Sequence, residues 1–105
     1  MTRQCPNLDA VRHEIDRLDR QLLILIAERG RYVAQAAAFK ASAAAVAAPQ
    51  RVEQIIARIT ALARELGADP AVVEATWRAM IAAFIASELQ THAQRAAATA
   101  PPPAP

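Results

Sequence analysis

The segment LDAVRHEIDRLDRQLLILIAER, residues 8–29, repeats apolar side chains at alternating intervals of three and four residues. These positions are Leu8, Val11, Ile15, Leu18, Leu22 and Leu25, and the next position of the series is Arg29. Such spacing is typical of an α-helix that packs one face against another helix. The opposite face is polar, and Asp16 and Arg20 form a favourable pair four residues apart. The segment therefore predicts an amphipathic helix and not a strand.

The pattern continues more loosely, so that this first helix is expected to run from about residue 8 to residue 40. Its one glycine, Gly30, is tolerated inside a helix at a cost of about 1 kcal/mol. At 1.5 Å per residue such a helix is roughly 50 Å long. That is long for a monomer of 105 residues, and it predicts packing against a second chain.

Two more helices are expected downstream of a connection, residues 41–48, whose sequence ASAAAVAA has no apolar period. Pro49 suits the first turn of a helix, and Gly67 suits the position after its end. Asp69 followed by Pro70 marks the start of the third helix. The apolar positions of these two helices are Val52, Ile55, Ile59, Leu62 and Leu66, then Val73, Trp77, Met80, Ile81, Phe84, Ile85 and Leu89.

The sequence thus predicts an all-α fold of three helices, one long and two shorter. We expect one helical domain over residues 8–95, after an N-terminal extension, residues 1–7. The last ten residues, 96–105, are rich in alanine and proline and are expected to form a disordered tail.

Composition narrows the class of protein. The formal net charge of +2 is too small to indicate a nucleic-acid partner. The single cysteine, Cys5, cannot form an internal disulfide and suits a reducing compartment. No apolar run approaches the ~20 residues of a membrane span, and residues 1–6 lack the apolar segment of a signal peptide. A cytoplasmic protein without a membrane partner is expected.

Several charged residues fall on faces that the pattern reserves for apolar ones. Arg29 takes a heptad position, and Lys40 lies 11 residues later, about 20° past three full turns, so both cations share a face. Glu88 lies on the apolar face of the third helix, and Arg51 opens the second. Unpaired buried charge is costly. The surplus of cations therefore suggests an anionic ligand, and arginine suits carboxylates through its two-pronged geometry.

Arg12 precedes Arg29 by 17 residues, about 26 Å along a helix. The two residues of one helix cannot both reach one small ligand. If both serve one site, Arg12 comes from the partner chain, which an antiparallel pairing of the long helices allows.

Each of these residues also has a purely structural interpretation. Arg29 could lay its stem on the core and reach solvent, and Lys40 could be a solvated charge near a helix end. Arg12 and Arg51 could be surface charges, and Glu88 could pair with a structural arginine. His13 and His92 lie on polar faces without ligand spacing, so no metal is expected.

The sequence resembles the all-helical chorismate mutases. The phrase Leu8-Asp9-Ala10-Val11-Arg12 looks like the opening helix of that family, and Leu25-Ile26-Ala27-Glu28-Arg29 looks like its "LLAxR" segment. The resemblance covers about residues 8–92. Within the family, the run from Phe39-Lys40-Ala41-Ser42 to Ala48-Pro49-Gln50-Arg51-Val52 resembles the isochorismate pyruvate-lyase branch, which makes salicylate for siderophores.

The resemblance implies an intertwined homodimer with two equivalent, cofactor-free sites for a dicarboxylate substrate. Arg12 of the partner chain and Arg29 would clamp the two carboxylates, and Arg51 would add positive potential. Lys40 would act on the ether oxygen, and Glu88 would share that role when protonated. The small-residue connection after Lys40 would close over the site.

The sequence departs from the family pattern in two respects. Position 88 is usually glutamine in the lyase branch and in many mutases, whereas this sequence has Glu88, which some mutases carry and use in its protonated form. The other departure bears on the substrate. Typical mutases carry acidic residues near the start of the second helix to hold the ring hydroxyl of chorismate, where this sequence has Ala48 and Val52. This favours isochorismate, whose hydroxyl lies elsewhere on the ring. The alternatives are a chorismate mutase that makes prephenate, which is also expected as a weak side activity, and a non-catalytic helical dimer that binds or regulates a partner.

Overall fold

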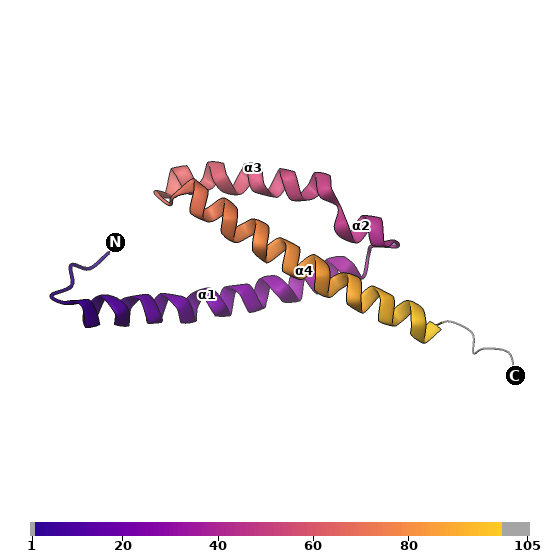
Figure 1. The fold of residues 1–105 in the computed structure, drawn as a ribbon, viewed down its shortest axis with the longest axis horizontal. Helices are drawn as coiled ribbons and strands as arrows, with labels where there is room; N and C mark the ends of the chain where they lie inside the picture. Colours follow the sequence, from indigo (N-terminus) through magenta and orange to yellow (C-terminus); the bar gives the residue numbers. More distant parts are fainter. Residues whose placement is uncertain (1, 100–105) are drawn as a thin grey trace, which may run out of the picture. The chain divides into compact units, whose positions relative to one another are not determined.

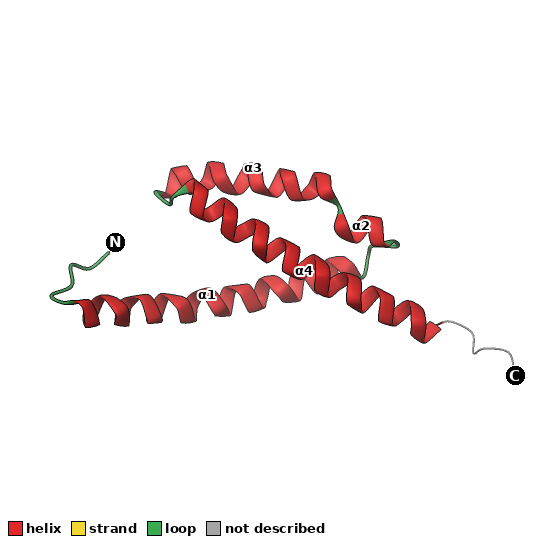
Figure 2. Cartoon of the chain, in the orientation of Figure 1, coloured by secondary structure: helices red, strands yellow, loops and turns green. Residues whose placement is uncertain are grey.

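The computed structural model describes residues 2–99 and is helical throughout its regular structure. Its elements are α1 (Leu8–Ala37), α2 (Ala43–Ala47), α3 (Pro49–Leu66) and α4 (Pro70–Thr99) (Figure 1). No strand occurs among the residues described, as the colouring by secondary structure shows (Figure 2). The prediction of an all-α fold is confirmed.

The helix lengths differ from the prediction in three places. α1 ends at Ala37, three residues before the predicted end at residue 40. The connection is not irregular throughout, because it contains the five-residue helix α2. α4 has 30 residues, the same length as α1, so only α3, with 18 residues, is a shorter helix as predicted.

The predicted start and stop signals lie at the ends of the helices. Asp69 Oδ1 accepts a hydrogen bond from the Ala71 amide (2.9 Å), which caps the start of α4 ahead of Pro70. Gly67 ends α3 with a φ of 77°, a left-handed conformation that an L side chain rarely adopts. Pro49 opens α3 as expected.

The short helix α2 is held by a polar cap and one buried side chain. Ser42 Oγ accepts a hydrogen bond from the Ala45 amide (3.1 Å), and Val46 is 2% exposed. Ala48, with a φ of 34°, separates α2 from α3. A non-glycine residue in this region carries a backbone cost, and the following Pro49 disfavours continuation of the helix through Ala48.

The chain divides into two compact units, one up to Val33 and the other from Ala34 onward, and α1 continues across the boundary. Within Leu8–Ala37 no residue is buried. The predicted apolar positions from Leu8 to Leu25 are all exposed, and Leu23, Ile24 and Ile26 beside them are exposed as well. The apolar face of α1 is therefore exposed along the length of the helix.

In the second unit α3 and α4 form an antiparallel hairpin, and α2 also contacts α4 (Figure 1). The buried apolar side chains of this unit are Val46, Ile56, Ala63 and Ile81. On α3 this differs from the predicted face, because Leu62 and Leu66 are exposed while Ile56 and Ala63 are buried. The apolar arc of α3 is wider than the strip that α4 covers.

The predicted tail begins inside α4. Residues 96–99 belong to the helix, which runs to Thr99, and residues 100–105 lie outside the described part of the chain.

Candidate functional site

The structure brings together two of the five candidate site residues, Lys40 and Glu88. Lys40 Nζ lies 3.4 Å from Glu88 Oε2, and 48 positions of sequence separate the two residues. The Glu88 side chain is 9% exposed and the Lys40 side chain 28%. A lysine and a glutamate therefore meet in a partly desolvated place, where an electrostatic contact is stronger than in open solvent.

Glu88 owes its position to the periodicity of α4. It follows the buried Ile81 by seven residues, which returns a helix to nearly the same face. Its neighbours on that face, Phe84 and Ile85, are half-buried. The prediction that Glu88 lies on the inward face of its helix is thus confirmed, and the charge that it carries there requires a partner.

Lys40 is placed by the end of α1. The amides of Phe39 and Lys40 donate to the carbonyls of Ala36 and Ala37 (both 3.1 Å), so that a tight turn carries the chain out of the helix. The Ser42 cap of α2 follows directly. Because both flanking helices fix this short link, the Lys40 stem leaves the backbone close to α4.

Arg51 lies in the first turn of α3 and is exposed. It is not part of the Lys40–Glu88 pair. Ala48 and Val52, which the resemblance predicts to stand where mutases carry acidic residues, are half-buried and bring no carboxylate. The one acidic residue in the first two turns of α3 is Glu53, and its carboxylate is bound elsewhere, as described below.

The remaining two candidates, Arg12 and Arg29, belong to the first compact unit and are described within α1. Arg12 is exposed near the start of the helix, and Arg29 is half-buried and takes part in an interaction. Their separation of 17 residues along one continuous helix corresponds to about 26 Å. One α1 helix therefore does not direct both guanidinium groups at the same small molecule.

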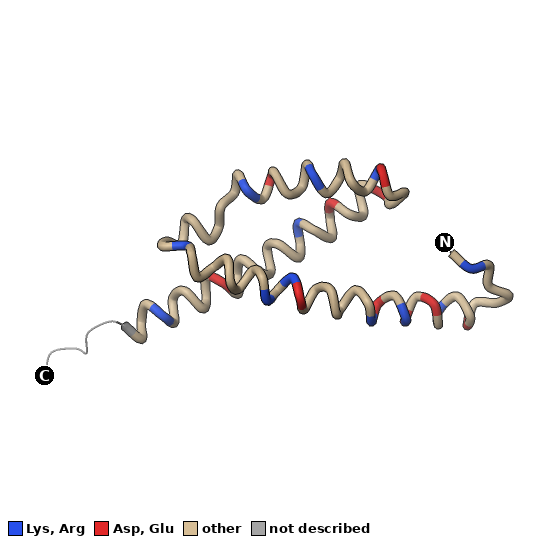
Figure 3. The backbone as a smooth tube through the Cα atoms, turned by 180° about the vertical axis from the view of Figure 1, so that it is seen from behind, with Lys and Arg blue, Asp and Glu red and all other residues tan. Residues whose placement is uncertain are grey.

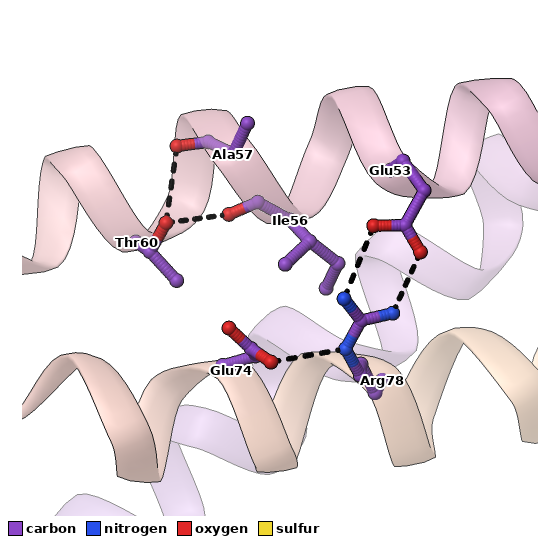
Figure 4. Close-up of polar contacts among 6 residues, drawn as sticks. All are labelled: Glu53, Ile56, Ala57, Thr60, Glu74 and Arg78. Atoms are coloured by element: carbon purple, nitrogen blue, oxygen red, sulfur yellow. Dashed lines mark hydrogen bonds and ion pairs between the residues drawn. The ribbon is translucent and has the colours of Figure 1, made fainter.

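A second set of ion pairs, which joins α3 to α4, was not predicted from the sequence. The Arg78 guanidinium donates to both carboxylate oxygens of Glu53 (2.9 and 3.1 Å) and to Glu74 Oε2 (3.2 Å) (Figure 4). This contact lowers the pKa of Glu53 and raises the pKa of Arg78, chiefly through the hydrogen bonds. The four-residue spacing of Glu74 and Arg78 was a detectable signal, whereas the link to Glu53 crosses between helices.

Elsewhere the charged residues are interspersed. Basic and acidic positions are mixed along α1, α3 and α4 (Figure 3). Within residues 2–99, no three side chains of His, Cys, Asp or Glu lie together as ligands for a metal ion. None of the helices in the described part of the chain combines the length and the apolar character that crossing a membrane requires.

Comparison with known proteins gives two matches. The model of the family chorismate mutase type II matches residues 11–89. The chain is also 35% identical over 86 residues to the isochorismate pyruvate lyase of Pseudomonas aeruginosa, and this match covers 82% of the chain and 85% of that protein. All five candidate residues, from Arg12 to Glu88, lie within the range that the family model matches.

Proposed function

Because this chain belongs to the type II chorismate mutase family, we propose that it is an isochorismate pyruvate lyase, which converts isochorismate to salicylate and pyruvate without a cofactor. The observation that carries the proposal is the Lys40–Glu88 pair, which puts a cation and a proton-binding group side by side in a partly buried place. The 35% identity to a protein of that activity supports the choice of reaction. The proposed location is the cytoplasm.

The proposed reaction is a pericyclic elimination in which every atom comes from the substrate. The bond between the ring and the ether oxygen breaks, and a ring hydrogen moves to the methylene of the enolpyruvyl group. The ring gains the double bond that makes it aromatic, and the ether oxygen becomes the keto oxygen of pyruvate. The protein has to fold the substrate into its reactive shape and stabilise the charge that develops.

Lys40 is proposed to stabilise the ether oxygen, where negative charge builds as the bond breaks. The Lys40 side chain is 28% exposed, and a cation that is partly withdrawn from water acts more strongly on developing charge than one in open water. Its present partner, Glu88, accepts a hydrogen bond from the ammonium through one oxygen at 3.4 Å. Two of the three ammonium donors are therefore left for the substrate.

Glu88 is proposed to act in its protonated form. As a carboxylate it holds Lys40 and repels a dianionic substrate. As a carboxylic acid it releases Lys40 and gains an O–H donor for the ether oxygen.

The second copy of the chain completes the proposed site. The apolar face of α1 buries none of its residues within one chain, although its apolar side chains are large and closely spaced. An antiparallel partner helix would cover this face and bring its own Arg12 toward Arg29 of the first chain. Those two arginines would clamp the two carboxylates of isochorismate, and Arg51 would add positive potential.

The α3 start favours the lyase over the mutase reaction. Ala48 and Val52 offer no acceptor for the ring hydroxyl of chorismate, and the nearby Glu53 carboxylate is held by Arg78 through two hydrogen bonds. Chorismate would bind without that contact. The family name nevertheless supports conversion of chorismate to prephenate as the second candidate, and we expect it as a weak side reaction.

The deciding experiment is incubation of the purified protein with isochorismate and, separately, with chorismate between pH 5 and 8. Salicylate fluorescence and prephenate formation are followed. Salicylate formed faster than prephenate supports the proposal. Prephenate as the main product makes the protein a mutase, and no turnover of either substrate favours a non-catalytic helical dimer.

Subunit complementation tests the shared site. Arg12→Ala and Lys40→Ala chains are each expected to be inactive as homodimers. Mixed at equal amounts under conditions of subunit exchange, they form dimers in which one site retains both residues. About a quarter of wild-type activity is expected to return, because about half of the dimers are mixed and each has one intact site. If mixing restores nothing, Arg12 and Lys40 act in the same chain or the site is not shared.

A further inference from the structure

Arg78 forms the most completely hydrogen-bonded ion pair between α3 and α4 that the structure describes. Both terminal nitrogens of its guanidinium bond to the two oxygens of Glu53, and its Nε bonds to Glu74 one turn away on the same helix (Figure 4). Glu74 therefore orients the Arg78 side chain, and Arg78 binds both carboxylate oxygens of Glu53. A two-pronged contact of this kind fixes direction as well as distance.

The first turns of α3 place Glu53 and Arg51 on opposite flanks of the helix. The buried Ile56 and Ala63 mark the strip of α3 that faces α4. At 100° per residue, Glu53 lies about 70° to one side of the middle of this strip, and Arg51 lies about 130° to the other side. Any rotation of α3 about its own axis therefore moves Glu53 and Arg51 together.

Apolar packing alone leaves such a rotation weakly opposed. The apolar arc of α3 is wider than the buried strip, because Leu62 and Leu66 continue it on the flank of Arg51. Apolar contacts have no preferred direction, so a rolled α3 would bury Leu62 or Ile55 in place of Ile56 at a modest difference in area. The start of α3 also follows Ala48, whose left-handed backbone makes a sharp break and not a continuous helical support.

We propose that Arg78 and Glu53 are positioning residues that prevent α3 from rolling on α4 and so hold Arg51 where it meets the substrate. The inference rests on the proposed function, because it takes Arg51 to face the dicarboxylate. Neither Arg78 nor Glu53 touches the substrate. They act by fixing the rotation of α3 about its axis, and Glu74 supports them by holding the Arg78 side chain.

The pair is exposed, so its loss should disturb the geometry of the site more than the stability of the fold. Exposed ion pairs contribute little to the free energy of unfolding. By contrast, a shift of about 1 Å in a group that positions a substrate can reduce the rate by as much as about 100-fold. We expect Arg78→Ala to lower kcat/KM about tenfold, mostly through a higher KM, because the positive potential of Arg51 would act on the carboxylates in the ground state and the transition state alike.

A double-mutant cycle in the full-length protein tests this. Arg78→Ala, Arg51→Ala and the double variant are assayed with isochorismate, and Arg58→Ala, which removes another exposed arginine of α3, is the matched control. Arg78→Ala is expected to cost about tenfold in the wild-type background and less than about twofold once Arg51 is gone. An unchanged KM in Arg78→Ala, or equal losses in both backgrounds, would overturn the proposal.

A second measurement separates this inference from the proposed reaction. Wild-type protein that turns over neither isochorismate nor chorismate refutes the proposed function. Methyl–methyl contacts between α3 and α4, observed by nuclear magnetic resonance, then decide whether the helix rolls. New contacts of Ile55 with α4 in Arg78→Ala, and not in Arg58→Ala, support the positioning role. An unchanged set of contacts overturns it.

Discussion

Two ion pairs join distant parts of the second unit, and they differ in geometry and in surroundings. The Arg78–Glu53 contact is two-pronged and short, at 2.9 and 3.1 Å, but its side chains are exposed. The Lys40–Glu88 contact is a single one of 3.4 Å, yet its side chains are 28% and 9% exposed. The well-formed pair lies where charge is screened, and the loose pair lies where charge acts strongly.

This difference in geometry and exposure suits the two ion pairs to different roles. A contact in which Arg78 donates from all three of its guanidinium nitrogens suits the fixing of a helix, because it sets the direction of the side chain as well as its distance. A long one-point contact in a desolvated place leaves two of the three ammonium donors for another acceptor. We therefore assign chemistry to Lys40 and Glu88 and geometry to Arg78 and Glu53, and the following variants are ordered by the size of the effect that this assignment predicts.

Replacing Lys40 with alanine should have the largest effect. Loss of a preorganised cation at the breaking bond is expected to lower kcat by at least about 100-fold, with a change in KM of less than about threefold. Steady-state kinetics with isochorismate measures both parameters. Arg58→Ala serves as the control for loss of one positive charge, and turnover unchanged in Lys40→Ala would refute its role.

Replacing Glu88 with glutamine should raise turnover. The amide keeps the size of the side chain, donates an N–H and no longer holds Lys40 by charge. Turnover at pH 8 is expected to exceed that of the wild type by about threefold or more. Steady-state rates of both proteins with isochorismate provide the test. Turnover equal to that of the wild type or below it would show that the charge of Glu88 does not oppose the reaction.

Replacing Glu53 with glutamine should affect stability only slightly. The variant loses the charge of an exposed pair, so the midpoint of thermal unfolding is expected to fall by at most about 3 °C near neutral pH. Circular dichroism at 222 nm on heating measures this. A fall of more than about 10 °C would mean that the pair holds the hairpin together and not merely its rotation.

The smallest effect should be the pH dependence of that difference. The Arg78 guanidinium holds the pKa of Glu53 below its ordinary value of 4.5 in the folded chain. The contribution of the Glu53 charge to the stability of the fold is therefore fully present above pH 4.5 and is lost as the pH falls through the lower pKa of the folded chain. Thermal midpoints of the wild type and Glu53→Gln should converge between pH 6 and 3. A difference between the two thermal midpoints that does not change with pH would mean that the charge of Glu53 does not stabilise the pair.

The regular features of the fold were readable because they depend on neighbours in sequence. Pro49, Gly67 and Asp69 act on the backbone within one turn, so their signals predicted the ends of α3 and the start of α4 correctly. The placement of Glu88 on an inward face followed from helical periodicity in the same way. The site residues themselves stay a prediction, except that Lys40 and Glu88 are seen to meet.

The features that sequence could not supply depend on contacts between distant segments. Helix α2 lies in a stretch without apolar period, and it forms where Val46 is buried against another helix and Ser42 caps it. The buried strip of α3 was predicted one flank away, because a wide apolar arc does not say which part a neighbour will cover. The Arg78–Glu53 pair joins residues 25 positions apart, and no local rule relates them.

The uncovered apolar face of α1 makes the proposed dimer a matter of concentration. No residue of α1 is buried within its own chain, so in the proposed dimer this helix would gain its stabilisation from the second chain, and folding of α1 and association would become one equilibrium. By mass action, dilution would then dissociate the dimer, and each proposed site would lose the residues that the partner chain contributes. The activity of each molecule would depend on how much of the protein a cell makes, and a threshold of expression would separate an inactive pool from an active one.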